Sequence, residues 1–155
     1  MSLLFSRECE YAIQAVTYLA RRPESFRTSI RNLARTLKIP HHFLAKILQR
    51  LTQKGLLTST KGPKGGFALG MPAADITLFH VVEAVDGVDF TNQCLLGFPE
   101  CSGKNPCAVH EQWGGIRETI YRLLVSRDIA EVGAAMKKPE YESATTPKSI
   151  GRKEK

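Results

Sequence analysis

The sequence lacks acidic residues over its most basic stretch. Between Ser25 and Gly70 it has nine lysine and arginine residues and no aspartate or glutamate. Solvated surfaces ordinarily mix both signs of charge, so this block indicates a polyanionic partner, and nucleic acid is the polyanion that we expect. Residues 1–70 carry a net charge of +9, whereas residues 71–155 carry −2, which assigns the expected contact to the first half of the chain.

Long hydrophobic runs are also missing. No apolar run is long enough to cross a bilayer, so we expect no membrane partner. The first residues turn polar by Ser6 and have no small-residue cleavage site, so we expect no secretory signal peptide. The expected location is therefore cytoplasmic, where cysteines are reduced thiols or metal ligands rather than disulfides.

Helical periodicity predicts three helices in the basic half of the chain. Apolar residues recur at helical spacing over residues 5–22, and again over residues 28–37, where Thr28 or Ser29 is the expected cap. A third helix is predicted from Pro40 to Gly55, with a polar, basic face opposite its apolar stripe. Two short helices joined by a tight turn fit a helix-turn-helix, but an ordinary helical hairpin has the same pattern.

The segment after the third helix distinguishes these alternatives. Residues 56–60 and 67–71 have the pattern of short strands, and the KGPKGG sequence between them is typical of a hairpin tip. A helix-turn-helix followed directly by a β-hairpin is a winged helix, so we expect a mainly α fold with a small β-wing. The same glycines superficially match a phosphate-binding loop, but the Gly-Lys-Ser/Thr ending and the strand-to-helix context are absent.

A winged helix assigns candidate DNA contacts to its third helix and its wing. Side chains on the outer face of the helix would read bases, and lysines at the hairpin tip would meet phosphates or enter a minor groove. The adjacent glycines would let the backbone approach DNA closely. The candidate residues are His41, His42, Lys46, Gln49, Lys61, Lys64, Gly65 and Gly66, together with Ser29 at the start of the second helix.

The second half is predicted to contain a short helix over residues 77–85, a long helix over 108–127 and a weaker one capped by Ser126 or Asp128. The long helix has an apolar seam that suits packing on its own domain or on a second copy. The seam residues are Trp113, Ile116, Ile120, Leu123 and Leu124. The expected division is a DNA-binding domain (1–87), a cysteine-rich loop (88–107), dimerisation and terminal helices (108–136) and a disordered basic tail (137–155).

Three of the four cysteines lie in a loop rich in glycine and proline. Cys94, Cys101 and Cys107 are followed by His110 in the spacing C-x6-C-x5-C-x2-H. Thiolates and imidazole are ligands for zinc or an iron–sulfur cluster. Zinc sites usually include a closely spaced cysteine pair, which this loop lacks, so a cluster is favoured over zinc and over three incidental thiols.

The sequence offers two other roles for cysteine. Cys9 lies alone beside the apolar face of the first helix, where a cysteine usually packs as a small hydrophobe. Cys107 and His110 are the only close Cys/His pair that nucleophilic catalysis could use, and nothing supplies a third, orienting group. We therefore do not expect an enzyme.

The segments FLAKILQRLTQKGLLTSTKGPKGGFAL and ITLFHVVEAVDG, with the cysteine loop, resemble the Rrf2 family of winged-helix regulators over roughly residues 3–125. The resemblance implies a homodimer on a palindromic double-stranded DNA operator, joined through the long helix. The interface residues would be Trp113, Ile116, Ile120 and Leu123. In cluster-carrying members three loop cysteines ligate iron, and the cysteines here match them, although the first interval is one residue longer than in IscR.

Members of the family differ in the fourth ligand and the cluster. In IscR-like members a histidine completes a 2Fe–2S site, and His110 matches it. In NsrR-like members a carboxylate of the partner subunit's first helix serves a 4Fe–4S cluster, and Glu10 stands at that position. The resemblance leaves both ligands available. His110 lies a single helical turn beyond Cys107, whereas Glu10 would have to come from another helix and another subunit, so we favour 2Fe–2S with His110 over 4Fe–4S with Glu10.

The function that the resemblance implies is a sequence-specific transcriptional regulator, expected to be a repressor. Its operator affinity would be controlled by an iron–sulfur cluster that senses iron–sulfur status, nitric oxide or redox stress. Two alternatives remain. One is a regulator controlled by a partner protein, as in CymR-like members that leave these cysteines unused, and the other is a winged helix with a structural zinc.

Overall fold

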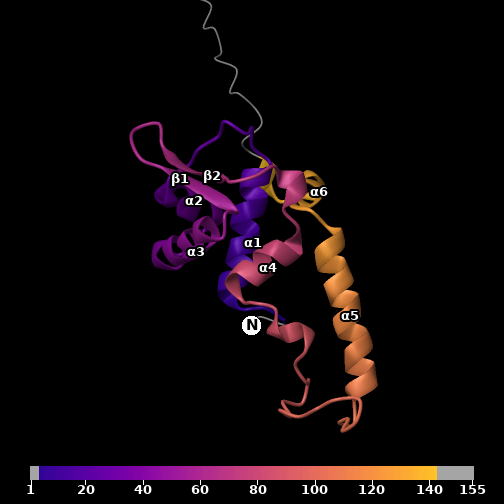
Figure 1. Cartoon of the computed structure of the whole chain (residues 1–155). Helices are drawn as coiled ribbons and strands as arrows, with labels where there is room; N and C mark the ends of the chain where they lie inside the picture. Colours follow the sequence, from indigo (N-terminus) through magenta and orange to yellow (C-terminus); the bar gives the residue numbers. More distant parts are fainter. Residues whose placement is uncertain (1–3, 143–155) are drawn as a thin grey trace, which may run out of the picture.

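The structure, a computed structural model, describes residues 4–142 and is mainly helical with one two-stranded antiparallel sheet (Figure 1). The helices are α1 (Arg7–Ala20), α2 (Ile30–Leu37), α3 (His41–Gln53), α4 (Leu78–Val85), α5 (His110–Ser126), α6 (Ile129–Ala135) and α7 (Pro139–Glu142). The strands are β1 (Leu57–Thr60) and β2 (Gly66–Leu69), and short 3-10 turns form at η1 (Ala73–Asp75) and η2 (Asp89–Thr91). The predicted fold class, mainly α with a small β-wing, is confirmed.

Short polar side chains begin several helices. The Ser29 hydroxyl accepts a hydrogen bond from the Asn32 N–H at 3.1 Å, so Ser29 rather than Thr28 caps α2. The Asp128 carboxylate accepts from the Glu131 N–H at 2.9 Å, which makes Asp128 the cap of α6. These caps use the first free N–H groups of each helix and so fix where it starts.

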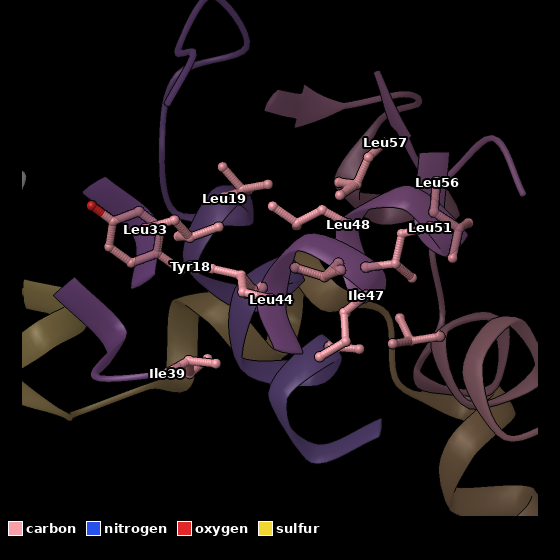
Figure 2. Packing of buried hydrophobic residues seen from close by; sticks show 14 of the residues in the cluster. Tyr18, Leu19, Leu33, Ile39, Leu44, Ile47, Leu48, Leu51, Leu56 and Leu57 are labelled. Carbon is pink, nitrogen blue, oxygen red and sulfur yellow. The ribbon is translucent and has the colours of Figure 1, made fainter. Parts of the chain in front are cut away.

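The hydrophobic core lies between α1 and α3. The apolar stripe predicted for the third helix is completely buried, as Figure 2 shows, and consists of Leu44, Ile47, Leu48 and Leu51. Leu33 of α2 and Leu19 of α1 belong to the same cluster. Since one face of α3 is fixed in this core, the face on the opposite side of the helix is held toward solvent.

The wing is a tight hairpin that also pairs with the segment before α2. Leu57 pairs with Leu69 and Thr60 with Gly66, and Thr28 exchanges backbone hydrogen bonds with Phe67 at 3.1 and 2.7 Å. A Cβ on Gly66, whose φ is +134°, would lie 2.6 Å from the Thr28 carbonyl oxygen. Glycine is therefore required there by the fold itself.

Helix α5 divides its apolar seam between two environments. Leu124 is buried, and Ile120 packs beside it against a small cluster that contains Cys9 and Val82 of α1 and α4. Ile116 and Leu123 are 51% and 54% exposed. In Figure 1 the helix extends away from the body, with the cysteine loop at the end farthest from the wing. Part of the seam therefore packs on its own chain and part is open.

The described part of the predicted tail begins as an ordered segment. Disorder was expected from Lys137 onward, but Pro139–Glu142 form α7 and Tyr141 is 3% exposed. The Tyr141 hydroxyl donates to the Gln14 carbonyl, and its own carbonyl accepts from Arg21 Nε, both at 3.0 Å. Composition alone missed this aromatic anchor. The rest of the predicted tail, residues 143–155, lies outside the described residues.

None of the helices formed by residues 4–142 combines the length and apolar character needed to span a membrane.

Candidate metal centre and nucleic-acid interface

The loop between η2 and α5 folds back on itself and brings its cysteines together. The sulfur atoms of Cys94, Cys101 and Cys107 all lie within 4.8 Å of one another. Cys94 Sγ is 3.7 Å from Cys107 Sγ, and no disulfide joins these free thiols. Cys101 Sγ lies 3.0 Å from His110 Nδ1. Three thiols and one imidazole, distant by up to 16 positions in sequence, thus form one cluster at the start of α5.

The cysteine cluster is tied to α5 at both ends of the loop. Trp113 Nε1 and an Arg117 guanidinium nitrogen, both on α5, donate to the Gln93 carbonyl at 2.8 and 3.3 Å. At the other end, the His110 N–H donates to the Cys107 carbonyl at 3.3 Å as the helix begins. Both ends of the loop are therefore held by hydrogen bonds to the first turns of α5.

The thiols of the loop differ in acidity. Desolvation raises the pKa of Cys94, but the backbone N–H groups of Phe98 and Leu96 stabilise its thiolate and outweigh that effect. Together with the Cys107 and Cys101 thiols, they lower the pKa of Cys94 to about 7. A hydrogen bond from the Cys107 backbone lowers the pKa of Cys101. Desolvation and the neighbouring Cys107 and Cys94 thiols together raise it by more, so the net shift of this pKa is upward.

The donor set fits an iron–sulfur cluster and also a single zinc ion. Thiolates are the usual ligands of both, and an imidazole can complete either. A cavity of about 20 Å³ lies between the cysteines and His110, which is room for about one atom. Cys101 and Cys107 also line an open depression of about 430 Å³, so a larger group has space on that side.

The remaining cysteine has a different environment. Cys9 is completely buried beside Val82 and Leu124, as expected of a small core hydrophobe. Desolvation, with smaller contributions from Asp86 and Glu10, raises the pKa of its thiol to about 12. Within the single chain, the half-buried Glu10 lies 3.8 Å from Arg7 and does not belong to the cysteine group.

The candidate DNA contacts lie on exposed parts of α2, α3 and the wing. All the polar and basic candidates are exposed, while the two wing glycines are half-buried. The exposed candidates are Ser29, His41, His42, Lys46, Gln49, Lys61 and Lys64. Gly65 and Gly66 face their own chain: a Cβ on Gly65 would lie 2.1 Å from the Thr60 carbonyl oxygen. Contacts within the chain therefore already explain why these two positions are glycine, and a close approach to DNA is not needed to explain it.

On α3, one basic residue pairs within its own chain, and one exposed aromatic residue was missed by pattern alone. Arg50 contributes to the basic block, but it forms a 3.0 Å ion pair with Glu8 of α1. Phe43, which helical periodicity did not single out, is 38% exposed, and its ring centre lies 4.3 Å from that of His42. Its position next to predicted base-reading residues is the sequence signal that could have made it a candidate DNA contact.

Comparisons with known proteins agree with this arrangement. A family model described as Rrf2, iron-dependent transcriptional regulator, matches residues 5–135. The HTH-type transcriptional regulator IscR of Yersinia pseudotuberculosis is 30% identical over 122 residues, which cover 79% of this chain and 74% of that protein.

Two solved structures share the fold. The structure of CymR, the global cysteine regulator of B. subtilis, has a TM-score of 0.74 at 23% identity, covering 87% of this chain and 99% of that one. IscR of T. potens has a TM-score of 0.66 at 22% identity, covering 89% and 95%. The relatives are named as transcriptional regulators and not as enzymes. The chain belongs to the Rrf2 family of transcriptional regulators.

Proposed function

We propose that this protein is a sequence-specific DNA-binding regulator whose operator affinity is controlled by an iron–sulfur cluster held by Cys94, Cys101 and Cys107. The observation that carries the proposal is the meeting of three thiols and His110 at the first residue of the long helix α5. The family description as iron-dependent and the relative named IscR support the same assignment. When bound, such a cluster supplies a redox-active group that reacts with oxidants and nitric oxide.

The chain's own residues connect this centre to the DNA-binding unit. Trp113 and Arg117 hold the loop to α5 through Gln93, and α5 packs on α4 through Phe79, whose ring centre lies 5.3 Å from that of Tyr121. Helix α4 in turn packs on α1 and α3. A rearrangement of the loop would therefore change how α5 sits on the winged helix.

The regulator is proposed to act as a homodimer through α5. Ile116 and Leu123 are seven positions apart and so lie on the same face of this helix, and each is about half exposed. A solvent-facing helix face is normally polar, so two large exposed apolar side chains on one face support contact with a second copy. In a dimer, two recognition helices must lie roughly 34 Å apart to reach successive major grooves. A small rotation of α5 would change that spacing and with it the operator affinity.

DNA contacts are proposed for the exposed face of α3 and for the wing. Lys64→Ala is expected to weaken binding to all duplex sequences about equally, because a phosphate contact carries no sequence information. The slope of log affinity against log salt should become shallower by about 0.9 for each lost contact. His42→Ala or Gln49→Ala should instead change base preference, by about 1–3 kcal/mol at one position. Fluorescence anisotropy at several salt concentrations measures both effects. An unchanged slope for Lys64→Ala would exclude the wing from the phosphate contacts.

The fourth ligand is proposed to be His110, with a 2Fe–2S cluster. Its Nδ1 is already beside Cys101 Sγ, whereas Glu10 would have to come from a partner subunit. His110→Ala should therefore lose or shift the visible absorption of the anaerobically purified protein, and Glu10→Gln should retain it. A His110→Ala protein with an unchanged spectrum, beside a Glu10→Gln protein that has lost its colour, would identify the carboxylate as the ligand.

Iron and acid-labile sulfide counts, measured with the absorption spectrum, test the cofactor itself. Equal amounts of iron and sulfide with a coloured protein are expected. Stoichiometric zinc in a colourless protein would assign the loop a structural role instead, because Zn²⁺ is d¹⁰ and does not absorb.

A further inference from the structure

Arg22, just beyond the end of α1, is a buried cation with no counterion in the described part of the chain. It is 8% exposed, and Nε and both terminal nitrogens lack a hydrogen-bond partner among the described residues. Its guanidinium carbon lies 4.0 Å from the centre of the Tyr18 ring and 5.7 Å from that of Phe26. The ring faces attract the cation, but they do not replace acceptors for five buried N–H groups. Buried polar groups in proteins are nearly always hydrogen-bonded, so the Arg22 guanidinium needs an acceptor that the described residues do not supply.

The neighbouring Arg21 provides a comparison, because its guanidinium forms hydrogen bonds within the chain. Its guanidinium donates to the carbonyls of Tyr141, Gly133 and Met136 and so fixes α6 and α7 against α1. Arg22 makes no such contact and no ion pair within residues 4–142. A structural role of the kind that Arg21 has therefore does not account for it.

A pocket lies beside Arg22, between the end of α1 and the end of β2. Its volume is about 480 Å³, within the range of about 300–1,000 Å³ that is usual for small-molecule sites. Apolar walls come from both sides and consist of Leu19, Phe26, Leu69 and Met71. Arg22 and Glu24 are the charged residues of the lining. The Arg22 guanidinium nitrogens are themselves covered in this structure, so a wall has to shift before a ligand can pair with them. Phe26 belongs to no helix or strand, and its ring lies against the guanidinium, so it is the part of the wall best placed to move.

We propose that this pocket binds a small organic carboxylate with an apolar body, whose carboxylate pairs with Arg22. The planar guanidinium matches a carboxylate in a two-point contact, and the apolar walls suit the body of the ligand. Glu24 on the rim disfavours a doubly charged anion such as phosphate. The proposed DNA contacts lie on α3 and the wing and not at the end of α1, so they do not account for Arg22 either.

The site is separate from the cysteine loop. Its lining comes from the end of α1 and from residues 69–73 at the end of the wing. Figure 1 shows the cysteine loop at the end of the molecule farthest from the wing. An occupant would contact both α1 and the residues that follow β2, so its binding would stiffen the attachment of the wing. The proposal does not depend on the cofactor, and the cluster-free protein serves for the test.

Thermal unfolding of the full chain with benzoate and with hexanoate tests the proposal, with benzyl alcohol as the neutral probe and inorganic phosphate as the bare anion. Each carboxylate should raise the midpoint by about 3–6 °C at ten times its dissociation constant, and neither control probe should do so. Arg22→Met should keep or increase the midpoint without ligand, since it removes an uncompensated buried charge, and should lose the carboxylate response. Arg31→Met, at an exposed position of α2, should retain the response.

Two results would overturn the proposal: a wild-type midpoint that no carboxylate moves, or an Arg22→Met protein that responds like the wild type. An Arg22→Met protein that unfolds at a clearly lower temperature and a wild type without response would together show a structural arginine. If Arg22→Met does not fold, the Arg22 Nε–H resonance of the wild type decides. It should shift with benzoate and not with benzyl alcohol, and an unmoved resonance also overturns the proposal.

Discussion

Replacing Cys101 with alanine is expected to abolish iron and sulfide binding by the protein purified without oxygen, and to leave it colourless. Cys101 Sγ lies within 4.8 Å of the other two loop sulfurs and 3.0 Å from His110 Nδ1, so its loss removes one thiol from the proposed ligand set. An iron atom that loses an anionic ligand is no longer held. Cys94→Ala and Cys107→Ala should have the same effect, because each provides one of the same set of thiolates.

Cys9→Ala is the matched control for the cysteine variants. Cys9 is buried in the core and away from the loop, so its replacement should cost about 1 kcal/mol of stability and leave the iron and sulfide content unchanged. Iron and sulfide analysis with visible spectroscopy gives both results. Full cluster content in any one of the three loop variants would remove that residue from the ligand set.

Ile116→Glu is expected to convert the proposed homodimer to monomer and to abolish operator binding. Ile116 is 51% exposed in the single chain, so a charge there is harmless to the monomer and is unpaired only when a second α5 covers it. An unpaired buried charge costs roughly 3–5 kcal/mol, which raises the dimer dissociation constant by a factor of about 100 or more. Sedimentation velocity measures the assembly, and anisotropy measures operator binding.

Val125→Glu provides the control on the same helix. Val125 is 37% exposed and follows Ile116 by nine positions, which at 100° per residue places it on the opposite face of α5. The variant should remain dimeric. If Val125→Glu dissociates and Ile116→Glu does not, the interface lies on the other face. The sequence-predicted Ile120 is a poorer test, since it packs on its own chain and its loss would also destabilise the monomer.

Features that depend on neighbours in sequence could be predicted from the sequence. Gly55, at φ +78°, follows α3 as the predicted end of that helix, and the hairpin forms between the two predicted strands. The loop cysteines could be recognised as candidate metal ligands because residue type and spacing can be read directly from the sequence. Their meeting with His110 follows from the loop turning back on the helix that it precedes.

Features that depend on packing between distant segments could not be predicted. Periodicity predicted one apolar seam on the long helix. The pattern alone does not show which seam residues pack on the chain's own core and which stay exposed. Only the structure therefore shows that Leu124 is buried and Leu123 is exposed. Composition suggested disorder after Lys137 and could not show that Tyr141 reaches Gln14. Arg22 was likewise indistinguishable from other residues of a basic sequence until its burial was known.

Operator affinity measured without oxygen, on one preparation before and after removal of the cluster, tests the central claim most directly. The two states should differ by about 5- to 150-fold, the range typical of coupling between two sites in a protein. The Cys101→Ala variant should bind the operator with the affinity of the cluster-free state. If the preparation binds DNA equally well with and without its cluster, the loop does not control the winged helix, and the proposed function is contradicted.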